Sequence, residues 1–226
     1  NPGLSPQVRA RYREMFQGTF YRRFVLGEWV AAEGRVYDFF DESFVQKAPR
    51  GEMEQWYISC DYGTVNPTSM GLWGLQGGVW YRVAEYYYDA RARRRQKTDE
   101  EYADELSRLA GDRKIRAVIA DPSAASFCET LQRRGWRVRK ADNRVLSGIR
   151  LTARLLKSGK LVICQGCRDA IREFGLYCWD EDTGGQDRVK KEHDHAMDEI
   201  RYFAATVAAK ENCVDFFAGS VERAPF

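Results

Sequence analysis

Hydrophobic residues gather in short runs after residue 55, and these runs are separated by polar or glycine-containing segments. The first three runs, at 56–61, 69–75 and 79–88, have the length and the aromatic or β-branched content of strands. Gln76-Gly77-Gly78 separates the second run from the third and is typical of a tight hairpin turn. The pattern therefore predicts three sequential strands, of which the second and third are antiparallel.

The rest of the chain alternates between helical and extended patterns. Thr98 and Glu101 form the residue pair of a capping box, which opens an amphipathic stretch that ends at Gly111. Strand hairpins followed by helix–strand crossovers predict an α/β fold, a mixed sheet with helices on both faces, in the strand order of a ribonuclease H-like domain. Further strands are expected at 115–120, 135–140 and 160–164, and further helices at 122–134, 145–157, 170–179 and 193–209.

Two aspartates stand at the ends of predicted strands. Asp61 ends the run at 56–61, and Asp121 follows the run at 115–120, directly before Pro122. The first and fourth strands of a mixed sheet can lie side by side and parallel, which would bring both carboxylates to one edge. Two carboxylates held that close repel each other unless a cation joins them, and Mg²⁺ and Mn²⁺ prefer such oxygen ligands. Either aspartate alone has the simpler explanation of a turn residue.

The last predicted helix opens with the acidic segment 193–202 (HDHAMDEIRY), which contains both histidines of the chain. Asp194 and Asp198 are four residues apart and share one helix face. The helix dipole favours an acid at a helix start, which explains Asp194 better than Asp198. We therefore interpret Asp198 as the third carboxylate of the site and Asp194 as a further candidate ligand. His195, three residues before Asp198, could bind the metal, position the nucleophile or assist proton transfer.

Three carboxylates from two strands and a helix can hold two divalent cations about 3.5–4 Å apart, an arrangement used for phosphodiester hydrolysis. The sequence therefore predicts a site with two Mg²⁺ or Mn²⁺ ions. Its candidate catalytic residues are Asp61, Asp121, Asp198 and His195, and its candidate metal ligands are Asp61, Asp121, Asp198 and Asp194.

Positive charge is concentrated in three runs, although the formal net charge is only +3. The runs lie at 91–97, 133–140 and 190–191. A single basic run is most simply a solvated surface, but three runs beside the acidic motifs favour a surface that follows a phosphate backbone. The candidate DNA-binding residues are Arg93, Arg94, Arg95, Lys97, Lys190 and Lys191.

Length and composition narrow the class of protein. A chain of 226 residues can form one α/β domain with its own core. The six cysteines include one CxxC at 164–167 but no second pair at zinc-ribbon spacing, so free thiols in a reducing cytoplasm are expected. No apolar run approaches the ~20 residues that cross a bilayer, and no membrane partner is expected.

The ends of the chain suggest a piece of a longer protein. It begins without Met or a signal-peptide pattern, and no glycine-rich phosphate loop is present for ATP hydrolysis by that route. We expect residues 1–50 to be a lead-in and linker, residues 51–212 to be the ribonuclease H-like domain, and residues 213–226 to be a tail.

An ordered set of segments resembles the large terminase subunits of tailed bacteriophages. The resemblance runs from about Thr19 to Ala205, and it implies a nuclease that cuts concatemeric double-stranded DNA at the start and end of packaging in the host cytoplasm. It further implies an ATPase motor domain in the same full-length chain, and the small terminase subunit and the portal as partners. The matching segments are 21–41, 58–63, 118–123, 148–150 with 155–163, and 194–202.

The resemblance also implies roles for individual residues. The first two acids of the family correspond to Asp61 and Asp121. The third is a helix acid that some members precede by a histidine three residues earlier, as His195 precedes Asp198. Other members carry an acid where Asp194 stands, which leaves the third ligand open.

Three other interpretations use the same residues. Asp61-Tyr62-Gly63-Thr64 resembles the phosphate loop of sugar-kinase or actin-like ATP-binding domains, but the chain is short for two lobes and lacks a second such loop. A junction resolvase or transposase of ribonuclease H-like fold would use the same acids. The lead-in that contains Gly27-Glu28-Trp29 argues against this interpretation. A DNA-binding module without activity would have little reason to keep all three acids.

Overall fold

A mixed sheet of seven strands lies at the centre of the computed structural model, which describes residues 34–180 and 187–209. The strand order is β1-β7-β4-β3-β2-β5-β6. The strands are β1 Val45–Gln46, β2 Gln55–Asp61, β3 Thr68–Gln76, β4 Val79–Tyr88, β5 Ile115–Ala120, β6 Val138–Lys140 and β7 Leu161–Cys164.

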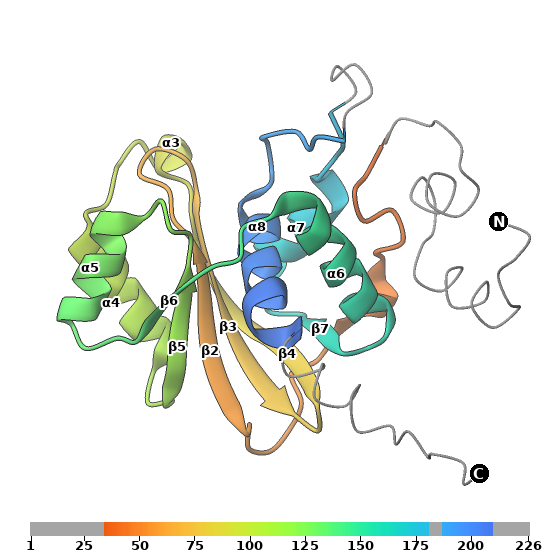
Figure 1. Cartoon of the computed structure of the whole chain (residues 1–226), viewed down its shortest axis with the longest axis horizontal. Coiled ribbons are helices and arrows are strands. Elements are labelled where there is room, and N and C mark those ends of the chain that lie inside the picture. The colour runs from red at the N-terminus through yellow and green to blue at the C-terminus, as the bar shows by residue number, and fades with distance from the viewer. Residues whose placement is uncertain (1–33, 181–186, 210–226) are drawn as a thin grey trace, which may run out of the picture.

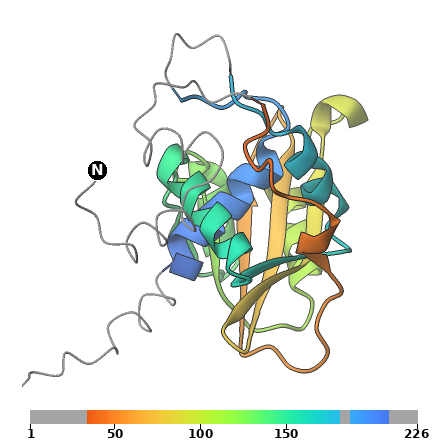
Figure 2. The same ribbon diagram turned by 90° about the vertical axis from the view of Figure 1, so that its right-hand side faces the viewer.

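Helices cover both faces of the sheet, as the sequence predicts. Helices α4 and α5 lie on one face and α6, α7 and α8 on the other (Figure 1). Helix α8 rests on β2 and β3, and α6 packs against α8 (Figure 2). The helices are α3 Ala90–Arg93, α4 Asp99–Ala110, α5 Ala125–Arg133, α6 Val145–Lys157, α7 Arg168–Leu176 and α8 His195–Phe203, with a 3-10 turn η1 Glu42–Phe44 and a π-helical turn η2 Ala204–Ala208.

The central strands follow the sequence prediction. Strand β3 pairs antiparallel with both β2 and β4. Gly77 and Gly78 have φ angles of 58° and 72°. A two-residue hairpin turn of type I′ needs such left-handed values at both central positions. The predicted capping box is also present, because Thr98 accepts a hydrogen bond from the Glu101 amide while the Glu101 side chain accepts one from the Thr98 amide.

Strands β2 and β5 are parallel neighbours that end together. Their register pairs Ile58 with Val118 and Cys60 with Ala120. The residues that follow the second pair are Asp61 on β2 and Asp121 after β5. The predicted juxtaposition of the first and fourth strands is therefore confirmed, and both aspartates lie at the same edge of the sheet.

Two hydrophobic clusters fill the spaces between the layers. One joins the sheet to α4 and α5 and includes Ile58, Leu106 and Phe127. The other joins the opposite face to α6, α7 and α8 and includes Trp73 and Phe203, whose rings stack with centroids 4.1 Å apart. This second cluster fixes α8 against the sheet, next to the strand ends that carry the aspartates.

Three predicted boundaries were wrong, two of them because local hydrogen bonds limit the element. Helix α5 begins at Ala125 rather than residue 122, because Asp121 accepts a hydrogen bond from the Ser123 amide and forms a turn. Strand β6 is shorter than predicted, because the amides of Gly135 and Trp136 still bond to the end of α5. Helix α7 ends at Leu176 rather than at residue 179.

Residues 177–179 leave the helix because they pair with other segments. Cys178 bridges to Arg35, and Trp179 bridges to Val189. Backbone hydrogen bonds flank the second bridge, from the Asp180 amide to the Arg188 carbonyl and from the Lys190 amide to the Cys178 carbonyl. Val189 anchors this pairing to the core, since it is buried at 3% exposure. Residues 181–186 lie outside the described residues.

Part of the predicted lead-in packs against the sheet and α7. Tyr37 and Phe40 are buried, and the Phe40 ring stacks on Phe174 of α7 with centroids 3.8 Å apart. Strand β1 joins the sheet by pairing with β7. These aromatic side chains of the predicted lead-in therefore contribute to the core. Residues 1–33 and the predicted tail at 213–226 lie outside the described residues.

Two expectations about composition can be compared with the structure. The described cysteines, at positions 60, 128, 164, 167 and 178, are free thiols. Among the helices that the structure describes, none combines the length and the apolar character needed to span a membrane.

Candidate metal centre

The pleat of the sheet turns the two strand-end aspartates toward α8. Ser59, two residues before Asp61, donates a hydrogen bond to Glu199 of α8. Ile119, two residues before Asp121, belongs to the cluster that contains the buried residues of α8. Because side chains two residues apart on a strand share a face, both carboxylates face the helix.

The start of α8 brings three more candidate residues to this edge. Asp194 is the N-cap of the helix, and His195 is its first residue. His195 Nδ1 lies 3.0 Å from Asp61 Oδ2, which connects the helix directly to β2. Asp198 is nearly buried at 7% exposure. The residues predicted from three separate segments therefore gather at one end of the sheet.

The acids of the site influence one another through their charges. The pKa of Asp61 is raised to about 6, because burial, together with the charges of Asp198 and Asp194, outweighs the hydrogen bond and the charge of His195. For His195, burial lowers the pKa, but the hydrogen bond and charge of Asp61 outweigh it, so the imidazole pKa is raised above its usual 6.5. The metal-free site thus pairs an acid that resists ionisation with a base that favours protonation.

Asp121 is in a more polar environment. Its pKa is lowered, because hydrogen bonds from Ser123, Asn143 and Tyr202 outweigh the effect of partial burial. The Ser123 amide lies 2.7 Å from Oδ1, and Asn143 Nδ2 lies 3.3 Å from Oδ2. Burial and the charges of Asp61, Asp198 and Asp121 raise the pKa of Tyr202. Tyr202 therefore lies among all three predicted carboxylates.

Side-chain cations neutralise the acids of α8. Lys191 Nζ lies 3.4 Å from Asp194 Oδ2 and 3.6 Å from Asp198 Oδ2. Arg201 Nη2 lies 2.8 Å from Asp198 Oδ1. That contact is not aligned as a hydrogen bond, and Asp198 Oδ1 is a buried oxygen without a hydrogen-bond partner.

The donor set suits a hard divalent cation, although it is not preassembled. Within residues 34–180 and 187–209, no three His, Cys, Asp or Glu side chains are already arranged to hold a metal ion. Asp61 is paired with His195, and the acids of α8 share Lys191. Asp198 Oδ1, which pairs with Arg201 but has no hydrogen-bond partner, and the carboxylates around it are ligands of the kind that Mg²⁺ and Mn²⁺ prefer. A cation would enter by displacing these side chains.

Helix capping does not explain the buried Asp194 carboxylate. Asp194 stands at the N-cap but makes no side-chain capping bond. Glu173 of α7 accepts the hydrogen bond of the Ala196 amide instead, at 2.7 Å from Oε2. The helix start therefore does not account for the buried Asp194 carboxylate, which is directed to Lys191 and stays a candidate ligand.

A buried ion-pair network behind the site was missed from sequence. Arg82 of β4 donates to Glu199 Oε2 from Nε at 3.0 Å and from Nη2 at 2.7 Å, and both side chains are fully buried. Ser59 and Trp73 also donate to Glu199. Gly71 leaves room for this network, since a Cβ there would collide with the Glu199 carboxylate. A charged residue inside the apolar run at 79–88 was the available signal.

A second set of contacts fixes α7 and α8 to β4. Glu85 accepts hydrogen bonds from the first amides of α7, at Asp169 and Ala170, and forms an ion pair with Arg82. The Tyr87 hydroxyl donates to Glu173 Oε1 at 2.6 Å. Carboxylates thus bind the N-termini of both helices, where the helix dipole favours negative charge.

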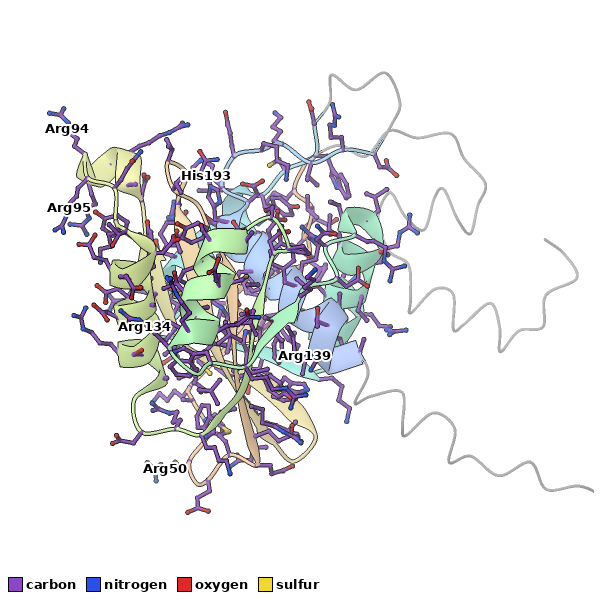
Figure 3. All side chains as sticks on the ribbon, turned by 60° about the vertical axis from the view of Figure 1, so that its left-hand side comes forward. Arg50, Arg94, Arg95, Arg134, Arg139 and His193 are labelled. Carbon is purple, nitrogen blue, oxygen red and sulfur yellow. The ribbon has the colours of Figure 1, made fainter. Side chains whose placement is uncertain are left out.

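Some of the candidate DNA-binding residues near α3 are exposed to solvent, and others form ion pairs with acidic side chains. Arg94 and Arg95 extend outward at the end of α3 in Figure 3, and Arg95 forms an ion pair with Glu101. Lys97 is mostly covered, because it pairs with Glu105 at 2.6 Å and lies over the ring of Tyr88. Arg93 and Arg94 are exposed, whereas Lys97 supports the fold.

The other basic runs are similarly mixed. Arg134 pairs with Glu100 and Asp104, and Arg139 donates to the Thr206 carbonyl. Lys190 is exposed, next to Lys191. Helix α3 and the segment that leads into α8 lie at the same end of the molecule, where β2 ends (Figure 1). Lys191 pairs with Asp194 and Asp198, so Lys190, its neighbour in the chain, also lies near these acids.

Comparison with solved structures gives the same fold. The large terminase of a thermophilic bacteriophage, solved in complex with ADP, is 46% identical with a TM-score of 0.85, and the match covers 92% of this chain and 53% of that one. The P22 large terminase nuclease domain is 19% identical with a TM-score of 0.62 over 76% of this chain and 91% of that one. No protein-family model and no curated protein sequence matches the chain.

A further match is the large terminase nuclease from the thermophilic phage G20c with bound magnesium, which is 14% identical with a TM-score of 0.59 over 76% of this chain and 97% of that one. The mixed sheet has the ribonuclease H-like fold and shares it with the P22 and G20c terminase nuclease structures. The chain belongs to the large terminases of bacteriophages. It spans about half the length of the ADP-bound terminase.

Proposed function

We propose that this domain is a metal-dependent endonuclease that cuts concatemeric double-stranded viral DNA during genome packaging. The observation that carries the proposal is the convergence of Asp61, Asp121 and Asp198 at one sheet edge, with a buried Asp198 oxygen that lacks a hydrogen-bond partner. The magnesium-bound G20c nuclease supports the choice of cation. Two Mg²⁺ or Mn²⁺ ions are proposed, held by these acids and by Asp194.

The residues of this chain would divide the chemistry. Bound divalent cations would supply an activated water and stabilise the leaving oxygen. Asp61, Asp121 and Asp198 would fix their positions from two strands and one helix. His195 Nδ1 lies 3.0 Å from Asp61. On leaving Asp61, the imidazole would either accept a proton from the attacking water or bind the scissile phosphate. Tyr202 would keep Asp121 oriented by its hydrogen bond.

Phosphate contacts are proposed for the exposed cations at the same end of the molecule. Arg93, Arg94 and Lys190 are exposed and would bind the backbone without reading bases. Arg95 and Lys191 would join them after leaving their acidic partners. Lys97 is the weakest of the predicted contacts, because its ammonium is already paired and covered.

The wider context is proposed from the family. The complete protein would carry an ATPase motor domain, would act with the small terminase subunit and the portal, and would function in the host cytoplasm. An ATP-binding role for the 61–64 segment is disfavoured by the structure. The Gly63 amide, which such a loop would offer to phosphate, donates to Thr68 Oγ1 at 3.1 Å.

Plasmid cleavage tests the proposal. The protein is expected to nick and linearise supercoiled plasmid with Mn²⁺ or Mg²⁺ and to be inactive in excess chelator, because the proposed hydrolysis needs bound cations to activate water and to stabilise the leaving oxygen. Asp61→Asn is the matched control, since it removes charge at nearly constant size. Cleavage that continues at full rate in chelator would overturn the metal mechanism.

A pH series sharpens the same experiment. The folded-state pKa of Asp61 is about 6, above its ordinary 3.8. Ionisation of Asp61 therefore destabilises the fold: the loss of stability is complete above about pH 6 and absent below about pH 4. Protons should therefore compete with metal below pH 6, and added Mn²⁺ should restore cleavage. In chelator at pH 7, Asp61→Asn should fold at least as stably as the parent protein.

A further inference from the structure

Lys191 stands between two of the proposed ligands. Its Nζ lies 3.4 Å from Asp194 Oδ2 and 3.6 Å from Asp198 Oδ2. These two carboxylates are buried, with side-chain exposures of 6% and 9%, whereas 71% of the Lys191 side chain is exposed. An ammonium in this position supplies the positive charge that two neighbouring buried carboxylates require.

The other cations of the site are held from several directions. The Arg201 side chain is 2% exposed and also donates to the Asn143 carbonyl at 2.6 Å. Its stem packs against Gly148, where a Cβ would come within 2.5 Å of Arg201 Cγ. His195 is fixed at the start of α8 and faces Asp61. Arg201 and His195 are therefore parts of the framework.

Lys191 differs from them in position. It lies on the segment between the buried Val189 and the start of α8, outside any helix or strand. A long unbranched side chain on such a segment can leave the acids and enter solvent without disturbing the core. Lys190, one residue earlier, is exposed as well but forms no ion pair with either acid in the part of the chain that the structure describes.

We infer that Lys191 is an internal counter-ion that competes with divalent metal for Asp194 and Asp198. In the metal-free protein the ammonium holds the two carboxylates together, and a cation binds them only after the ammonium has moved away. The inference rests on the proposed metal site. It assigns control of metal affinity to Lys191, and no bond-making step.

Manganese titration of the DNA-free protein tests this inference. Lys191→Met keeps the apolar stem, removes the charge and adds no oxygen ligand. It is expected to bind Mn²⁺ about three- to tenfold more tightly than the parent in calorimetry, the range expected for removing two partly solvated ion pairs. Lys190→Met removes an equal charge one residue away and should change affinity much less, and Lys191→Arg should keep the parent affinity.

The outcomes separate this inference from the proposed function. If Asp198→Asn binds Mn²⁺ as tightly as the parent, the proposed metal site is wrong. If Asp198→Asn loses Mn²⁺ while Lys191→Met binds it no more tightly than the parent, the metal site stands and the counter-ion role is wrong. Equal tightening by Lys190→Met and Lys191→Met would also overturn the inference, because it would indicate a general charge effect.

Discussion

Asp198→Asn is expected to reduce plasmid cleavage by about a thousandfold or more at saturating Mn²⁺. A thousandfold corresponds to losing about 4 kcal/mol of the stabilisation that the metal gives the transition state, because each 1.36 kcal/mol of activation free energy changes a rate tenfold. Asp198 is nearly buried, has an oxygen without a hydrogen-bond partner, and raises the pKa of Asp61 through its charge. Asparagine keeps the shape but removes the charge, so the fold should survive.

Two neighbouring substitutions provide the comparison. His195→Ala is expected to slow cleavage by about ten- to a hundredfold, because it removes a positioning or proton-transfer group while the acids remain. Asp194→Asn should slow cleavage less than Asp198→Asn while still weakening Mn²⁺ binding, since both acids face Lys191. Cleavage rates and Mn²⁺ affinities of the three variants are measured together. Loss of metal in Asp194→Asn but not in Asp198→Asn would invert the assignment.

Removing one partner of the Arg82–Glu199 pair is expected to destabilise the fold by about 3–5 kcal/mol. Both side chains are fully buried, so Glu199→Leu removes one of the two acids that pair with the guanidinium, and Arg82→Met removes the cation that pairs with both Glu199 and Glu85. Burial lowers the pKa of Arg82, but the charges of Glu199 and Glu85 outweigh it and keep the guanidinium charged. The network also connects β4 to α8.

The double variant Arg82→Met with Glu199→Leu separates charge from packing. Because it removes both charges, its loss of stability should be smaller than the sum of the two single losses by about 2 kcal/mol or more. Urea unfolding of the four proteins measures this coupling. Additive losses would show that the two residues act independently and that the pair does not organise the sheet face under α8.

The local patterns of the sequence were sufficient for most of the sheet. Apolar runs bounded by turn residues gave β2 to β5, and the positions of Asp61 and Asp121 after such runs gave their shared edge. That inference succeeded because side-chain alternation and parallel pairing are short-range rules with few alternatives. The helix 145–157 was predicted at its observed bounds for the same reason.

Long-range contacts decided what could not be predicted. The end of α7 depends on pairing of Cys178 with Arg35, far away in the sequence. The role of Glu199 depends on its ion pair with Arg82. Asp194 does not cap α8, because Glu173 accepts the hydrogen bond of the Ala196 amide. Among the basic residues, Lys97 was expected to face DNA, and its acidic partner could not be identified without the fold.

The most direct test of the metal site is a crystal of this domain soaked in Mn²⁺, measured at a wavelength where manganese scatters anomalously. Anomalous peaks are expected between Asp61, Asp121 and Asp198, about 3.5–4 Å apart if two ions bind. Lys191 should then have moved away from the acids. A well-ordered site without an anomalous peak, in which Lys191 still bridges Asp194 and Asp198, would contradict the account.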